Sequence, residues 1–274
     1  MFDVIKSMLE KFNIDLVSCI ALDECKIKRP YLLERNGIKN GTAVIFAVPY
    51  LSHTAAQARN ISSYAVSRDY HLFFSSLFEE MIKELTLIFP NNKFVGFTDH
   101  SPIDEIEAAA KAGLGVIGEN HLLITEKYSS FVFLGEIITD AALTSNTGEI
   151  RHCIKCGKCL SACPVSGNID LCLSAMTQKK GELNDSEKSA LIKHGCAWGC
   201  DICQEVCPYT ASAIAKGTIY TKVDFFNNFL TPILTCKAIK EMNDAEFRER
   251  AYSWRGKATI MRNLQILEEK EDTP

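Results

Sequence analysis

The feature that most constrains this chain is the spacing of its cysteines in the second half of the sequence. The first group reads Cys153-x2-Cys156-x2-Cys159-x3-Cys163-Pro164. This spacing is typical of bacterial ferredoxins, in which three thiolates bind one iron-sulfur cubane and the fourth binds a second cubane. The proline that follows turns the chain away, so that the fourth sulfur points to the other cluster. The motif therefore predicts two 4Fe-4S clusters that carry single electrons.

A second group, Cys200-x2-Cys203-x3-Cys207-Pro208, has one cysteine fewer, and Cys172 lies between the two groups. Because each cubane takes four thiolates, two cubanes need all eight of these cysteines. An exchange of ligands between the groups gives the predicted ligand sets. The predicted ligands of cluster one are Cys153, Cys156, Cys159 and Cys207, and those of cluster two are Cys163, Cys172, Cys200 and Cys203.

Two alternatives remain for the cysteines. Paired CxxC motifs also form closed, tetrahedral zinc sites, although the proline after the last cysteine of each group favours clusters. Cys196, four residues before Cys200, is an alternative cluster ligand. The other isolated cysteines, Cys19, Cys25 and Cys236, are interpreted as small buried apolar residues.

Composition limits the class of protein. The N-terminal segment mixes charged and apolar residues and lacks the apolar core of a signal peptide, and no run of 18 apolar residues predicts a membrane span. Twelve cysteines in a chain without an export signal indicate metal or redox chemistry. We therefore expect a cytoplasmic monomer with no membrane partner. The net charge of −4 gives no basis for tight non-specific binding of nucleic acid, so any RNA contact would be local.

Hydrophobic periodicity predicts an α/β (α+β) domain in the first half of the chain. Helical patterns at 2–12 and 71–89 alternate with apolar runs at 16–22, 42–50 and 93–98, which predict buried strands. Further strands are expected at 121–125 and 130–139. A helix is expected from Ser101 to Gly113, with Ser101 as its N-cap and Pro102 in its first turn.

The predicted organisation has three consecutive parts. Residues 1–148 form the α/β domain, and a polar segment at 144–148 (TSNTG) separates it from a ferredoxin-like double-cluster module at 149–212. Residues 213–274 show helical spacing and are expected to form a short helical segment that packs on the first domain.

Several motifs occur in an order that resembles the epoxyqueuosine reductase family. These are Ala112-Gly-Leu-Gly followed by Ile117-Gly118 and Asn120, the segment 133–140 (FLGEIITD), the segment 199–208 (GCDICQEVCP) and the segment 253–257 (SWRGK). The resemblance extends from about residue 40 to 267. It implies cobalamin bound without its lower base, electrons that pass from an external donor through two clusters, and removal of an epoxide oxygen from a modified tRNA nucleoside.

The resemblance also implies roles for individual residues. Asp99 corresponds to the family's proton donor, since a carboxylic acid can protonate a leaving oxygen. His71, Gly113, Gly115 and Asn120 are expected near the corrin. Without the resemblance, Asp99 is interpreted as a turn or capping acid and His71 as a surface residue. His100 is an alternative acid or a residue that orients Asp99.

The chain departs from the family at several positions. The family's Asp-Thr-Gly is Asp99-His100-Ser101 here, Glu119 stands where the family commonly has lysine, and the sequence resembles a short form without the C-terminal helical repeats. These departures bear on the substrate more than on the clusters. The alternative function is a two-cluster, ferredoxin-like electron-transfer protein without catalysis of its own.

Overall fold

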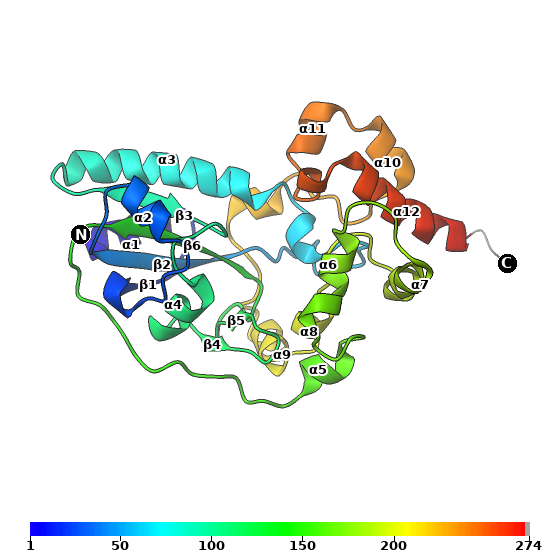
Figure 1. Cartoon of the computed structure of the whole chain (residues 1–274), viewed down its shortest axis with the longest axis horizontal. Helices are drawn as coiled ribbons and strands as arrows, with labels where there is room; N and C mark the ends of the chain where they lie inside the picture. Colours follow the sequence, from blue (N-terminus) through cyan, green and yellow to red (C-terminus); the bar gives the residue numbers. More distant parts are fainter. Residues whose placement is uncertain (272–274) are drawn as a thin grey trace. The chain divides into compact units, whose positions relative to one another are not determined.

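The computed structural model describes residues 1–271 and divides them into two compact units (Figure 1). Unit 1 contains residues 1–50, 71–156 and 208–223, and unit 2 contains 51–70, 157–207 and 224–271. This division differs from the three consecutive parts expected above. Residues 213–223 belong to unit 1 and 224–271 to unit 2, and the three-part functional division stays a prediction.

A four-stranded sheet forms the centre of unit 1. Its strands are β1 (Leu16–Ala21), β2 (Thr42–Pro49), β3 (Phe94–Phe97) and β6 (Val132–Thr139). Their order is β1-β2-β6-β3, and every neighbouring pair is antiparallel. The predicted mixed α/β class is therefore confirmed, with an antiparallel sheet. The central strand β2 is buried along its whole length, which agrees with its unbroken apolar sequence.

Helices cover both faces of this sheet. Figure 1 shows α3 (Tyr70–Ile88) along one face and α4 (Glu105–Lys111) on the other. Gly135 of β6 faces α3, where a Cβ atom would approach the ring of Phe74 and come within 2.8 Å of Phe46 Cζ. Because side chains alternate along a strand, Glu136 points to the opposite face, among the apolar residues that pack beneath α4.

Helix α4 begins later than the sequence predicted. Its N-cap is Asp104, whose Oδ1 accepts a hydrogen bond from Glu107 N, and not Ser101. Ser101 is fully buried, and its Oγ accepts a hydrogen bond from Ile103 N. Ser101 therefore forms a turn before the helix, and Asp104 satisfies a free N–H group of the first helical turn.

The remaining elements of unit 1 are short. They are α1 (Phe2–Lys11), α2 (Pro30–Arg35), the two-stranded sheet of β4 (Val116–Ile117) and β5 (Leu123–Ile124), and α9 (Pro208–Ala215). The predicted strand at 121–125 is confirmed in its central two residues.

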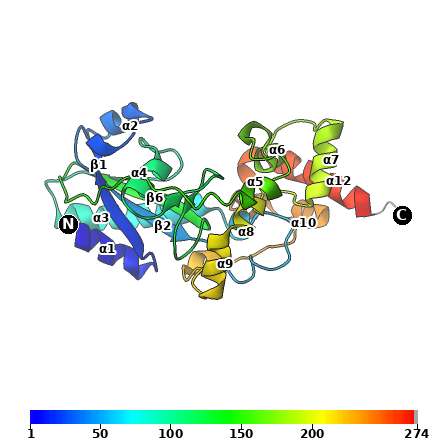
Figure 2. The same cartoon turned by 90° about the horizontal axis from the view of Figure 1, so that it is seen from below.

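Unit 2 consists of helices joined by loops (Figure 2). Its helices are α5 (Lys158–Ala162), α6 (Leu173–Thr177), α7 (Asp185–His194), α8 (Ile202–Glu205), α10 (Cys236–Glu241), α11 (Asp244–Arg248) and α12 (Lys257–Glu271). Trp198 is fully buried, packs against Tyr252 and donates from Nε1 to the Tyr64 hydroxyl at 2.7 Å. Among the described helices of both units, none combines the length and hydropathy needed to cross a bilayer.

Candidate functional site

Asp99 lies in the loop that follows β3, with its backbone in the left-handed region at φ +59°. Its carboxyl Oδ2 is 3.3 Å from His71 Nε2, and both side chains are about half exposed (56% and 53%). Left-handed backbone is uncommon for residues other than glycine and often marks a functional turn. The structure thus brings together two residues that the sequence placed near one site, 28 positions apart.

A second acid, on α4, contacts the backbone of Asp99. Glu105, the first residue of α4, accepts a hydrogen bond at Oε1 from Asp99 N at 3.1 Å. Burial, followed by the charge of Asp99, raises the pKa of Glu105 to about 7. Glu136 is completely buried beside it, and burial, followed by the charge of Glu105, raises the pKa of Glu136 well above its usual value. This loop therefore lies over a pair of carboxyl groups.

His100, next to Asp99, is directed to another partner. Its Nε2 lies 2.8 Å from the Tyr31 hydroxyl, and the Ser101 carbonyl accepts a hydrogen bond from Arg29 Nη1 at 2.9 Å. These contacts tie the loop to the start of α2. The role of His100 as an alternative acid stays a prediction.

The residues expected near the corrin have local structural roles. Gly113 has φ +82°, and a Cβ added there would meet no atom within 4 Å. A Cβ on Gly115 would lie 2.9 Å from the Ile124 carbonyl carbon, so glycine lets β4 approach β5. Asn120 Oδ1 accepts from Leu122 N at 3.4 Å within the same turn. The location of these residues near a corrin stays a prediction.

The four cysteines predicted for cluster two all lie in unit 2. Cys163 follows α5, Cys172 precedes α6, and Cys203 is in α8, which packs against α5. Burial raises the pKa of Cys200 to about 12, and the charges of nearby Cys203 and Cys172 add to this effect. The structure therefore places Cys172 close to the second cysteine group. A thiolate at Cys200 needs a compensating positive charge, which iron would supply.

The cysteines predicted for cluster one belong to both units. Cys153 and Cys156 fall in unit 1, where Cys153 N donates to the Ile117 carbonyl at 3.0 Å, whereas Cys159 and Cys207 fall in unit 2. All eight cysteines are free of disulfides. The pairing of these four stays a prediction.

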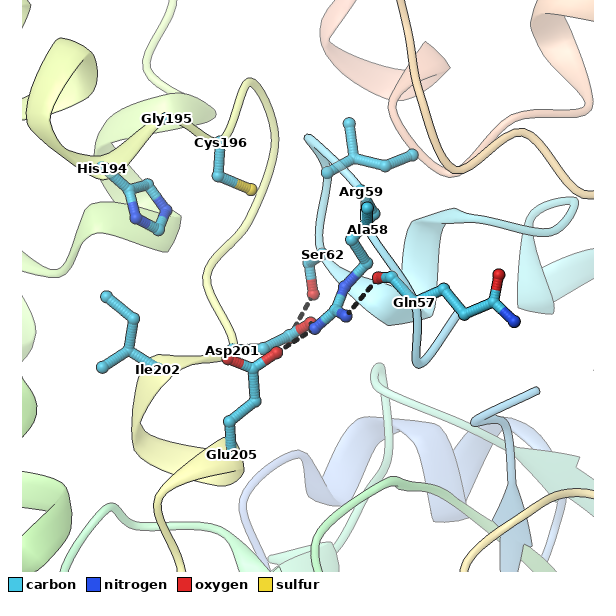
Figure 3. Close-up of a pocket in the computed structure, with 11 residues that line it drawn as sticks. Gln57, Ala58, Arg59, Ser62, His194, Gly195, Cys196, Asp201, Ile202 and Glu205 are labelled. Carbon is cyan, nitrogen blue, oxygen red and sulfur yellow. Dashed lines mark hydrogen bonds and ion pairs between the residues drawn. The ribbon is translucent and has the colours of Figure 1, made fainter. Parts of the chain in front are cut away.

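A pocket of about 300 Å³ lies beside the second cysteine group in unit 2 (Figure 3). The Arg59 guanidinium forms ion pairs with Asp201, at 3.0 Å, and with Glu205. Asp201 is 4% exposed and also accepts from Ser62 Oγ at 2.5 Å and from Ser63 N at 2.7 Å. Because Asp201 lies between Cys200 and Cys203, these bonds fix the cysteine loop against the segment 51–70.

Cys196, the alternative cluster ligand, lines this pocket. Its Sγ donates to the Trp198 carbonyl at 3.3 Å, and burial raises the pKa of the thiol to about 12. In this arrangement the sulfur is engaged by its own loop.

Sequence reasoning did not identify Glu105, Glu136, Arg59 or Asp201 as important residues. For Glu136 a signal was present, because a single carboxylate interrupts the apolar run from Val132 to Ile138. For Arg59 and Asp201 no local pattern exists, since the partners are 142 residues apart.

Comparison with known proteins supports the predicted cluster domain. Residues 152–210 match the family described as 4Fe-4S double cluster binding domain, and this segment contains all eight predicted ligands. The prediction of a 4Fe-4S cluster domain is thereby confirmed.

Proteins named epoxyqueuosine reductase are similar over a longer part of the chain. That of Gloeobacter violaceus is 35% identical over 70% of this chain and 62% of its own length, and that of a Synechocystis species is 30% identical over 69% and 67%. The structure of the Streptococcus thermophilus enzyme has the same fold, with a TM-score of 0.78 at 24% identity over 96% of this chain and 80% of that one.

This chain spans only 48% to 62% of the first three curated relatives that it matches. The Synechocystis relative is nevertheless 30% identical to this chain, which spans 67% of its length. The chain therefore belongs to the epoxyqueuosine reductase family.

Proposed function

We propose that this chain is an oxidoreductase that removes the epoxide oxygen of a modified nucleoside in tRNA. The observation that carries the proposal is the exposed Asp99–His71 pair in a chain of this family that also contains a double-cluster domain. The same observation favours an enzyme over the alternative of a simple electron carrier, which has no need of an exposed acid on a left-handed loop.

The residues present fit the implied cofactors. Eight disulfide-free cysteines provide four thiolates for each of two 4Fe-4S clusters. The exposed side chains of Asp99 and His71 offer polar groups beside which a corrinoid would bind in unit 1. When bound, the clusters supply single electrons and cobalamin supplies a metal that can deliver them to a carbon–oxygen bond.

The proposed reaction needs both electrons and protons. Conversion of an epoxide into an alkene and water takes two electrons, from an external donor, and two protons. The Asp99 carboxylic acid donates a proton to the leaving oxygen, and His71, 3.3 Å away, orients the carboxyl group and can return a proton to it. Efficient donation requires that Asp99 be protonated near neutral pH.

Related structures support the substrate and the acid. An epoxyqueuosine reductase of this fold was crystallised with an epoxyqueuosine-modified tRNA stem loop. The Bacillus subtilis enzyme was solved with a catalytic loop that carries an aspartate swung out of the active site. In this chain the loop that follows β3 carries Asp99. We infer that Asp99 is the corresponding acid.

The test uses the full chain, reconstituted anaerobically with iron, sulfide and cobalamin. Wild-type protein should retain cobalamin and convert epoxyqueuosine in tRNA to queuosine when a strong reductant is present. Replacement of Asp99 by Asn should lower the single-turnover rate by at least about 100-fold, the usual contribution of a general acid, with iron content unchanged. Asp23→Asn, an exposed acid of the same unit, is the matched control.

Two outcomes would contradict the proposal. If wild-type protein binds no corrinoid and leaves the modified tRNA unchanged, the carrier function becomes the better explanation. If Asp99→Asn turns over at the wild-type rate, Asp99 has no part in the reaction.

A further inference from the structure

Glu136 occupies a position at which a carboxyl group is costly. It lies in the middle of β6, paired with Ile45 of β2 and Phe97 of β3, and its side chain is 0% exposed. Within the described part of the chain, its carboxyl oxygens form no hydrogen bond of good geometry; the nearest donor is the Ser101 hydroxyl, whose effect on the Glu136 pKa is outweighed by burial and by the charge of Glu105. An ionised carboxylate in such a place would be strongly disfavoured, so this group is held in its neutral form.

The neighbour of Glu136 is a second carboxyl group. Glu105 reaches it from the start of α4, and the two groups are within hydrogen-bonding reach. A carboxylate accepts hydrogen bonds but cannot donate them. The contact is therefore favourable only when one of the two carries a proton, and two adjacent buried carboxyls cannot both ionise at neutral pH.

The two acids have different surroundings. Glu136 is fully buried and has the Ser101 hydroxyl as its one neutral donor nearby, whereas Glu105 accepts a hydrogen bond from Asp99 N and also interacts with the charge of Lys28. Three further titratable groups face these acids: Asp99 interacts with both, Cys25 interacts with Glu136 and Lys111, and His71 Nε2 lies 3.3 Å from Asp99 Oδ2. A donor and a cation favour the ionised form of Glu105, so the shared proton belongs on Glu136.

We propose that Glu105 and Glu136 form a proton-sharing pair that positions Asp99 and keeps it protonated at neutral pH. Glu136 holds the proton and donates it in a hydrogen bond to Glu105. Glu105 carries the negative charge and accepts the hydrogen bond from the Asp99 N–H group. Its charge disfavours ionisation of the Asp99 carboxyl. The inference rests on the proposed role of Asp99 as proton donor.

The direct test is a titration of the Asp99 carboxyl carbon by NMR, in full-length protein labelled at its aspartate and glutamate carboxyl carbons. Asp99→Asn identifies the signal. The Glu105→Gln change removes the charge but keeps an oxygen that can accept the Asp99 N–H bond. It should lower the midpoint of the Asp99 titration by about one pH unit or more, as expected for loss of a like charge close by. Glu107→Gln, two residues further along α4, is the matched control and should leave the midpoint unchanged.

Two variants of Glu136 separate a positioning role from a simple packing role. Glu136→Leu fits the apolar surroundings but cannot donate a hydrogen bond, so Glu105 should become neutral and the Asp99 midpoint should fall as in Glu105→Gln. Glu136→Gln can still donate to Glu105 and should restore the wild-type midpoint. In wild-type protein the Glu136 signal should be that of a carboxylic acid at pH 7.

The result that overturns the inference is an Asp99 midpoint that is the same in wild type, Glu105→Gln and Glu136→Leu. A Glu136 signal of an ionised carboxylate at pH 7 would overturn it as well. These measurements need neither cofactor nor substrate, so they decide the inference even if the reductase activity is absent. If wild-type protein is active, the alkaline limb of its single-turnover pH profile should move with the Asp99 midpoint in each variant.

Discussion

Asp201 is the residue whose removal should disturb unit 2 most. Its buried carboxylate accepts from Ser62 Oγ, Ser63 N and Gln204 Nε2, and it pairs with Arg59, which is only 13% exposed. In Asp201→Ala, the Ser63 N–H group would lose its hydrogen-bond acceptor. Arg59 would keep Glu205 as its remaining carboxylate partner.

The magnitude follows from these lost partners. A buried N–H group without an acceptor costs about 1–3 kcal/mol, and loss of one member of a buried ion pair costs about 3–5 kcal/mol when the other charge stays buried. Because Glu205 still neutralises part of the Arg59 charge, we expect a decrease of about 3–5 kcal/mol in total in the free energy of unfolding. Asp201→Asn keeps one acceptor oxygen and should cost less, about 2 kcal/mol.

Urea unfolding of the iron-free protein, followed by the fluorescence of buried Trp198, measures this change near the site. The control is Asp185→Ala, an exposed acid in the first turn of α7, which should cost no more than about 1 kcal/mol. In the double variant Arg59→Met with Asp201→Asn, the loss should be smaller than the sum of the two single losses, because the charge that remains, on Glu205, is half exposed and hydrated. An Asp201→Ala protein that unfolds at the wild-type urea concentration would refute this account.

Three further predictions concern the clusters and the sheet. Cys172→Ser should lower the iron content after reconstitution from about eight to about four atoms per chain, whereas Cys196→Ser should keep about eight. Equal iron content in the two variants would contradict the proposed ligand set. Gly135→Ala should lower the free energy of unfolding by about 1–3 kcal/mol, because its Cβ would press on Phe46 and Phe74, and a Tm equal to that of wild type would show that these rings move freely. Burial raises the pKa of Glu136, so the native state keeps a proton that the unfolded state releases above about pH 4.3. Wild-type stability should therefore fall as pH rises from 5 to 8, by up to about 1.4 kcal/mol per pH unit, and the dependence should be weaker in Glu136→Gln.

The strands and the cysteine module could be predicted because their signals are local. Apolar runs identified β1, β2, β3 and β6, and fixed cysteine spacing identified the cluster domain. The predicted start of α4 was wrong because Ser101 and Asp104 are both capping residues within four positions. The side chain of Asp104, not that of Ser101, accepts the hydrogen bond from the N–H group of the first helical turn. The division into units could not be read from consecutive segments, since each unit is assembled from separate stretches of chain.

The candidate site shows the same limit more clearly. Asp99 and His71 came from a resemblance, but the acids beneath Asp99 depend on the register of β6 against β3, which no short motif encodes. A charged residue within an apolar strand is a usable signal when it is treated as a buried group in need of an explanation. The sequence cannot show whether donors surround that group.

The surroundings of two buried acids therefore assign them opposite roles. Asp201 receives bonds from backbone, hydroxyl, amide and guanidinium donors, an arrangement that suits a carboxylate and holds a loop in place. Among the described residues Glu136 has only the Ser101 hydroxyl as a nearby donor, and its other polar neighbour is an acid, an arrangement that suits a stored proton. Asp201→Ala should therefore lower stability at neutral pH. Glu136→Gln should change stability little at neutral pH and raise it, relative to wild type, at alkaline pH. The number of donors around each carboxyl, rather than burial alone, decides which of the two acids supports the fold and which one is available to chemistry.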